Sequence, residues 1–138
     1  MSCFDWSPEL ETGYKVVDDQ HKQLFALANA LQGCALAPAR DADAVGEAVY
    51  GLTDYVIEHF TAEEALMRLF EYPEVGLHKM LHDQLTSDVL SLAARYFNGE
   101  DVPAEAVSTF VAEWLREHIG SQDMRAVKHI RAHRAGLE

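Results

Sequence analysis

The sequence has 138 residues, of which 49% are hydrophobic and 25% charged, a composition typical of one globular domain. Its net charge of −12 argues against nucleic acid and anionic membrane surfaces as partners, because both are bound through basic faces. The sequence contains neither a membrane-spanning apolar run nor a signal peptide, so we expect a cytoplasmic protein. Its two cysteines, Cys3 and Cys34, fit free thiols in a reducing compartment.

Residues 1–17 include Trp6, Pro8 and Gly13 and show no helical period. We therefore expect an extended N-terminal arm that packs on the domain. Trp6 is the natural anchor of such an arm, and simple burial is enough to explain it.

A first helix is predicted over about residues 19–36, before Pro38. Asp18 and Asp19 are good N-cap residues for its start. Its apolar stripe carries a histidine, His21. A single histidine on such a face is most often a hydrogen-bonded core residue, so His21 by itself indicates little.

A second helix is predicted from about residue 41 to residue 70, ending before Pro73. Its stripe carries His59 and Glu63 one turn apart, at the centre of an apolar face. The full stripe is Val45, Val49, Leu52, Val56, His59, Glu63, Leu66 and Phe70. A buried carboxylate without a partner costs several kcal/mol, so a metal ion or a buried cation should lie opposite this pair. Glu64 lies about 100° further around the helix, where we expect it to be solvated.

A third helix is predicted over about residues 74–97, ending at Asn98-Gly99, which is a common C-terminal signal. His78 and His82 head its apolar face. Their four-residue spacing places two imidazoles one above the other, where they can share a metal ion.

A fourth helix is predicted to open with Pro103 in its first turn, and its stripe leads to Trp114 and His118. The next carboxylate is Asp123, five residues after His118. A regular helix separates such a pair by about 140°, whereas residues four apart differ by only about 40°. If both side chains reach one centre, the backbone must widen or break near Gly120.

The C-terminal segment, residues 124–138, is predicted to contain a short amphipathic helix. His129 and His133 repeat the four-residue spacing there, but basic residues surround them and no buried acid accompanies them. We expect a surface pair. Four helices with short connections then predict an all-α, up-down-up-down four-helix bundle, a single domain over residues 1–138 with an N-terminal arm and a short C-terminal helix.

Each of the four main helices carries one or two metal-type ligands on its core stripe. The set is His21, His59, Glu63, His78, His82, His118 and Asp123. A purely structural account would require five buried histidines and two buried acids to satisfy one another by hydrogen bonds, which polar burial makes costly. The pattern therefore indicates a metal centre.

The motifs resemble those of a known family. The segments VDDQH (17–21), HFTAEE (59–64), HKMLH (78–82) and HIGSQD (118–123) are similar to the four motifs of hemerythrins, in their single-domain bacterial form. The arm with Trp6 and the position of Trp114 match as well, and the resemblance covers nearly the whole chain.

The resemblance implies a non-haem di-iron centre (Fe2+/Fe3+) with an oxo or hydroxo bridge and dioxygen as its ligand. His78, His82 and His118 would hold one iron, and His21 and His59 the other. Glu63 and Asp123 would bridge the two. With one bridging oxygen, this set leaves one octahedral position open, on the iron that only two histidines hold.

A site rich in neutral histidines suits reversible oxygen binding, for carriage, storage or sensing, rather than an enzyme. Carboxylate-rich di-iron sites favour onward oxidation. The alternatives are a di-iron oxidase, a peroxidase, a nitric-oxide-handling enzyme, iron storage and a zinc protein. Whether an oxygen-consuming protein partner receives the oxygen is left open by the sequence. Candidates for an apolar oxygen pocket are Phe60, Met67, Trp114, Leu115 and Ile119. For each of them ordinary core packing is the favoured explanation, except for Trp114, which the family pattern favours as a pocket residue.

Overall fold

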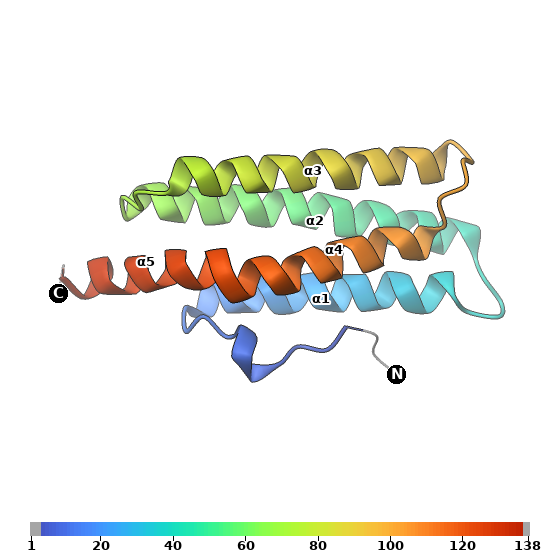
Figure 1. Ribbon diagram of the computed structural model, residues 1–138. Coiled ribbons are helices and arrows are strands. Elements are labelled where there is room, and N and C mark those ends of the chain that lie inside the picture. Colours follow the sequence, from blue (N-terminus) through green and yellow to red (C-terminus); the bar gives the residue numbers. More distant parts are fainter. Residues whose placement is uncertain (1–3, 137–138) are drawn as a thin grey trace.

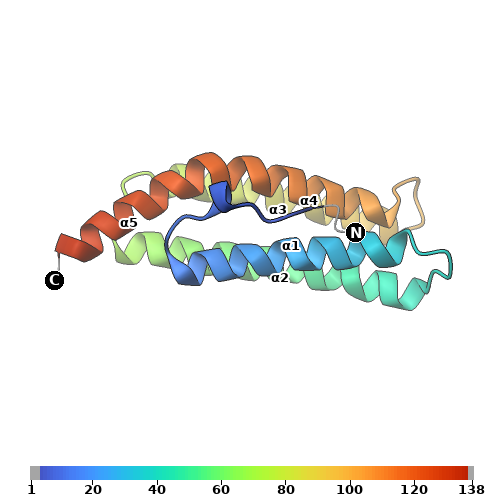
Figure 2. The same cartoon turned by 90° about the horizontal axis from the view of Figure 1, so that it is seen from below.

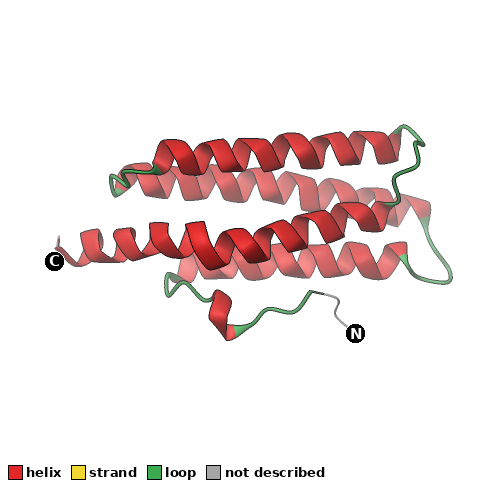
Figure 3. Ribbon diagram, viewed as in Figure 1, coloured by secondary structure: helices red, strands yellow, loops and turns green. Residues whose placement is uncertain are grey.

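The computed structural model describes residues 4–136, with side chains as far as residue 133. Every regular element in this part of the chain is a helix, as Figure 3 shows, and the all-α prediction is confirmed. The elements in order are η1 (Pro8–Leu10), α1 (Lys15–Ala35), α2 (Ala42–Leu69), α3 (Val75–Phe97), α4 (Ala104–His118), η2 (Ile119–Asp123) and α5 (Met124–Gly136).

The four long helices α1 to α4 form the predicted up-down-up-down bundle. α1 packs against α2 and α4, and α3 packs against the same two helices from the other side. Consecutive helices run in opposite directions, and α5 continues α4 beyond the N-terminal end of α1 (Figure 1). No helix within the described residues is long and apolar enough to cross a membrane.

The apolar stripes meet in one main core that runs along the bundle. This cluster includes Leu24, Phe25, Leu31, Leu52, Val56, Leu85, Val111, Leu115 and Ile119. A smaller cluster of Met67, Tyr72, Ala126 and Ile130 lies where α5 packs. Along α2, His59 and Glu63 come between Val56 of the first cluster and Met67 of the second. The polar site is thus held between two apolar layers.

The prediction that the first helix begins near residue 19 is wrong, because α1 already begins at Lys15. The carboxylate of Asp18 does not cap the helix. It accepts hydrogen bonds from the Thr12 backbone N–H (2.9 Å), the Thr12 hydroxyl (2.7 Å) and the Gly13 backbone N–H (3.0 Å). Asp18 therefore fastens the end of the arm to the first turn of α1.

The arm runs along the outside of α1 and α4 (Figure 2). Its backbone is held by two side chains: Asn29 pairs with the N–H and C=O of Phe4, and Arg116 donates to the Asp5 carbonyl at 2.6 Å. Trp6 is half-buried and packs edge-on against Phe25 with ring centroids 5.9 Å apart. The arm thus contacts both α1 and α4, the first and last helices of the bundle.

Helix ends follow local chemistry. Asp41 caps α2 by accepting from the backbone N–H groups of Asp43 and Ala44. Pro103 stands at the N-cap of α4, one residue before the helix rather than in its first turn.

Cys34 is a free, half-buried thiol, whereas Cys3 lies outside the described residues.

α2 and α3 end in the same way. In each case the two residues after the C-cap return hydrogen bonds to carbonyls of the last turn, with a left-handed residue at the first of them. In α3 that residue is Gly99 (φ 75°), the usual choice, whereas in α2 it is Glu71 (φ 54°).

Candidate metal centre

The last helical stretch contains the predicted widening. Residues Ile119–Asp123 form a π-helical turn between α4 and α5. This turn lets His118 and Asp123 reach the same point, with His118 Nε2 3.1 Å from Asp123 Oδ1. The expectation of a π-type turn near Gly120 is confirmed.

The structure brings all seven predicted metal-type side chains together in the bundle core. They come from α1 (His21), α2 (His59, Glu63), α3 (His78, His82), α4 (His118) and η2 (Asp123). Each is between 0 and 4% exposed. Their ligand atoms form two overlapping groups that share both carboxylates. One group holds His78, His82 and His118, and the other holds His21 and His59.

Glu63 divides its two oxygens between the groups. Oε1 lies 3.0 Å from His78 Nε2 and 3.3 Å from His82 Nε2. Oε2 lies 3.1 Å from His59 Nε2 and 3.4 Å from His21 Nε2. One carboxylate thus faces the imidazoles of both groups, which is the placement that a bridging ligand requires.

Asp123 divides its oxygens in the same sense. Oδ1 lies 3.0 Å from His78 Nε2 and 3.1 Å from His118 Nε2, whereas Oδ2 lies 3.1 Å from His21 Nε2. Both carboxylates therefore connect the three-histidine group to the two-histidine group.

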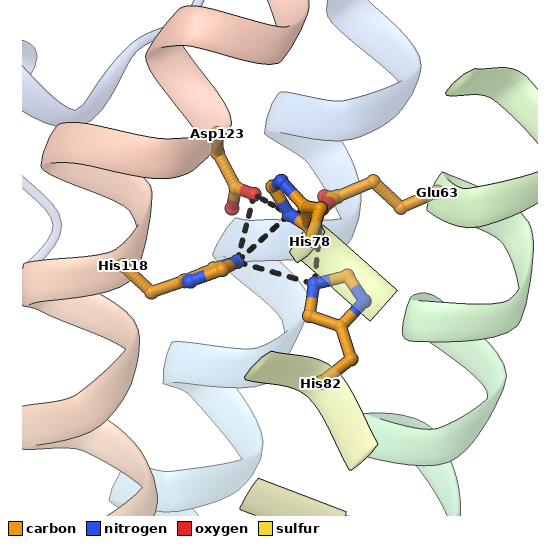
Figure 4. A group of neighbouring side chains, drawn as sticks. All are labelled: Glu63, His78, His82, His118 and Asp123. Carbon is orange, nitrogen blue, oxygen red and sulfur yellow. Dashed lines mark hydrogen bonds and ion pairs between the residues drawn. The ribbon is translucent and has the colours of Figure 1, made fainter. Parts of the chain in front are cut away.

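The three-histidine group is drawn in Figure 4, with its nitrogens converging beside the carboxylates. His118 Nε2 lies 2.9 Å from His78 Nε2 and 3.1 Å from His82 Nε2. Three ring nitrogens this close cannot all carry protons without repulsion. A cation bound by their lone pairs satisfies all three, and so the arrangement fits a metal ion.

Two of the histidines have their outer nitrogen occupied. His59 Nδ1 lies 2.7 Å from Gln20 Oε1, and His82 Nδ1 lies 2.8 Å from Glu64 Oε2. Because both partners offer oxygen acceptors, each Nδ1 carries the proton and each Nε2 presents its lone pair to the centre. These partners are what a metal-binding histidine ordinarily has.

The expectation that Glu64 is solvated is wrong, since the residue is only 8% exposed. Glu64 lies four residues after Phe60 and three before Met67, and both of these are buried. The buried face of α2 is therefore wider than one stripe and includes Glu64. That flanking pair of large apolar residues was the available signal. Gln20, which the sequence analysis also missed, is visible only as the neighbour of His21.

Several buried polar atoms of the site lack a hydrogen-bond partner among the described residues. They are both ring nitrogens of His21, His59 Nε2, Glu63 Oε2 and both oxygens of Asp123. Buried polar atoms are nearly always satisfied, so this concentration at one point calls for a further group. Imidazole nitrogens and carboxylate oxygens together suit a transition-metal ion. The residues fit a metal centre.

Burial and the mutual contacts of histidines and carboxylates shift the pKa values of the site residues. Burial by itself would lower the pKa of His21 and of His78, but the nearby carboxylates of Asp123 and Glu63 outweigh it and raise each pKa to about 9. Burial and the charge of Glu63 would raise the pKa of Asp123, yet His118, His21 and His78 lower it to about 2. Burial is the main cause that lowers the pKa of His118. Against its own burial, four histidines hold the pKa of Glu63 well below its ordinary value.

Aromatic rings cover one side of the centre. Phe60 stacks on His82 with centroids 3.8 Å apart and planes 2° from parallel. Trp114 stacks on His118 at 4.2 Å and lies 5.6 Å from Phe60. Trp114 is half-buried and, with His118, borders a surface pocket of about 180 Å³. These rings lie mainly on the three-histidine group.

The other pocket candidates are fully buried. Leu115 and Ile119 belong to the main core, and Met67 belongs to the smaller cluster. Near the two-histidine group, the ring of Trp6 lies 6.4 Å from that of His21. The arm thus contributes an aromatic ring to the two-histidine side of the centre.

His129 and His133 lie apart from the centre on α5. His129 Nε2 donates to the Phe70 carbonyl at 2.9 Å, and the two histidine rings stack with centroids 5.8 Å apart. Both are half-buried rather than fully exposed, so the expected surface pair is better described as a contact that docks α5 on the end of α2.

A helical bundle with a buried centre of five histidines and two shared carboxylates has the architecture of the bundle proteins that build metal sites in their core. The family model described as "Hemerythrin HHE cation binding domain" matches residues 12–130. The chain belongs to the hemerythrin family.

Relatives agree with this assignment. The chain is 32% identical over 133 residues to "Bacteriohemerythrin" of Stenotrophomonas maltophilia, across 96% of this chain and 85% of the relative. Another "Bacteriohemerythrin", of Methylococcus capsulatus, is 32% identical over 124 residues, across 89% and 93%. A crystal structure of wild-type hemerythrin has a TM-score of 0.85 and 30% identity, and the match covers 94% of this chain and 98% of that one.

Proposed function

We propose that this chain binds dioxygen reversibly at a di-iron centre, for oxygen carriage, storage or sensing. The observation that supports this most is the division of Glu63 and Asp123 between two unequal histidine groups. One group has three imidazoles and the other has two, and both share the same two carboxylates. One metal position therefore has five protein donors and the other has four.

In this proposal His78, His82 and His118 hold one iron, and His21 and His59 hold the other. Glu63 and Asp123 would be shared by both ions, and an oxo or hydroxo group would complete the pair. The four-donor side is then left with one open position. When both ions are ferrous, the centre supplies two electrons and that open position to dioxygen.

The chain's own residues explain why binding should be reversible. Five neutral imidazoles and only two carboxylates keep the charge of the centre low, whereas carboxylate-rich bundle sites stabilise higher oxidation states. Apolar side chains beside the site exclude water, which would otherwise promote loss of bound oxygen in a reduced form. In the proposal this lining is Phe60, Met67, Trp114, Leu115 and Ile119.

The test is a cycle of oxygen binding and removal. The protein is loaded with iron, reduced without oxygen, titrated with dioxygen and then flushed with argon, and absorption is followed throughout. We expect one dioxygen per two irons and full recovery over repeated cycles. Continuous oxygen consumption with a reductant would instead support an oxidase or peroxidase. A preference for zinc, or uptake of many irons per chain, would contradict the proposal in favour of a zinc or storage protein.

A further inference from the structure

The two metal positions differ in the groups that hold their histidines from behind. On the three-histidine side, His82 Nδ1 lies 2.8 Å from a carboxylate oxygen of Glu64. On the two-histidine side, His59 Nδ1 lies 2.7 Å from the amide oxygen of Gln20. The two contacts are nearly equal in length and serve the same ring nitrogen, but one partner is anionic and the other is neutral.

The contact with Glu64 is built into the core. The residue is 8% exposed, and its partner His82 is 1% exposed, so water screens their interaction weakly. An anionic acceptor on Nδ1 makes the opposite nitrogen a stronger donor to a metal than a neutral acceptor does. It also places one full negative charge directly behind the ligand.

Orientation alone does not require this carboxylate. The ring of His82 already stacks on Phe60 at 3.8 Å, with the planes 2° from parallel, so its plane is fixed by packing. Any acceptor would fix the tautomer, as Gln20 does for His59. What Glu64 adds is charge on one side of the centre.

We propose that Glu64, acting through His82, makes the three-histidine metal position more electron-rich than the two-histidine position, where neutral Gln20 fills the corresponding place. This inference rests on the proposed two-metal site and adds that its two positions differ in affinity and potential. The ion held by His78, His82 and His118 should bind more tightly and lose an electron at lower potential than its neighbour.

The chain offers an exchange experiment. Glu64→Gln removes the charge and keeps an oxygen acceptor, Gln20→Glu adds a charge behind His59, and the double variant exchanges the two. Glu47→Gln, on an exposed turn of the same helix α2, removes one charge away from the centre and is the matched control. Glu64→Ala removes both charge and acceptor.

The first measurement is Co²⁺ binding without oxygen, in competition with a chelator. Loss of a partner behind a metal-binding histidine typically weakens metal binding by about 10–100-fold. We expect a loss of this size for one of two ions in Glu64→Ala, and a loss of about 10-fold, at the lower end of this range, in Glu64→Gln, which keeps an acceptor. Gln20→Glu should bind the other ion more tightly, and the double variant should show both changes together. Glu47→Gln should bind like the parent.

The second measurement is an anaerobic redox titration of the iron-loaded proteins. We expect the midpoint potential to rise in Glu64→Gln and to fall in Gln20→Glu. Unchanged affinity and potential in Glu64→Gln would overturn the proposal. So would a change seen only in Glu64→Ala, because the acceptor rather than the charge would then matter. Neither readout uses oxygen binding, so a failure of the proposed function is recognised separately, by the oxygen cycle.

Discussion

His118 Nε2 lies 3.1 Å from Asp123 Oδ1, although the two residues are five positions apart on one uninterrupted helical path. A regular α-helix would place them about 140° apart around its axis. The π turn over Ile119–Asp123 removes this difference and delivers both side chains to the centre. An irregularity of one turn thereby supplies one of the two shared carboxylates.

Changing the length of this turn should decide metal uptake. Deleting Gly120, which has open space around it, leaves Asp123 four positions after His118, where a regular helix keeps both on one face. Inserting one alanine after Gly120 makes the separation six, about 240° apart in a regular helix. We expect two irons per chain in the deletion variant and loss of the pair in the insertion variant. Full iron content in a folded insertion variant would contradict this account.

Glu63→Ala should abolish the metal pair. The carboxylate faces imidazoles of both groups at 3.0 to 3.4 Å, so its removal takes a ligand from each ion. Metal analysis of the folded variant should give less than one ion per chain. His129→Ala and His133→Ala are the controls, and both should keep two ions, since these residues contact Phe70 rather than the centre.

The metal-free protein should lose stability on the alkaline side. The pKa of His21 and of His78 is about 9 in the folded protein, against an ordinary 6.5, because Asp123 and Glu63 outweigh burial. The folded state then holds more protons between these values, so this contribution is complete below about pH 6.5 and is lost as pH rises through about 9. Denaturant unfolding at a series of pH values measures it.

Loading with metal provides the control for that experiment. Metal binding requires neutral imidazoles, so the alkaline loss should disappear and protons should be released on binding near pH 8. Asp123 contributes to stability at the acid end of the pH range. Its pKa falls from 3.8 to about 2 on folding, and its contribution is lost only as pH falls through about 2. A metal-free protein equally stable at pH 6 and above pH 9 would refute the prediction.

Glu71→Gly should stabilise the protein. Glu71 occupies the left-handed position after α2 (φ 54°), and Gly99 occupies the same position after α3 (φ 75°). A side chain in this conformation costs about 1 kcal/mol, partly offset by the greater freedom of glycine in the unfolded chain. We expect a gain of several tenths of a kcal/mol in the free energy of unfolding. Gly99→Glu should lower the free energy of unfolding. Gly99 has open space around it, so the loss would come from the left-handed backbone rather than from a steric clash.

Trp114→Ala should keep both irons but shorten the lifetime of the oxygenated form. The indole stacks on His118 at 4.2 Å and borders the surface pocket there, so its loss should admit water to the centre. The decay of the oxygen-dependent absorption band measures this. Trp6→Ala, which opens the side of His21, is the informative comparison. An unchanged lifetime in Trp114→Ala would remove the shielding role and leave oxygen binding untouched.

Within the described residues, the sequence by itself determined the helices, their pairing into a bundle and the residues at the centre. Helical periods are a property of one segment, so His59 with Glu63, and His78 with His82, could be placed on core faces without any tertiary information. The demand that His118 and Asp123 meet even predicted the π turn. The start of α1 escaped prediction, because Asp18 is a good helix cap that instead binds the arm through Thr12.

Only the tertiary structure decided which groups meet across helices. Glu63 turns one oxygen to His78 and the other to His59. Glu64 lies behind His82, and Gln20 lies behind His59. These contacts depend on how far each helix is rotated and shifted against its neighbours. That rotation is set by the packing of apolar side chains such as Phe60 along the whole interface, and a sequence period carries no information about it.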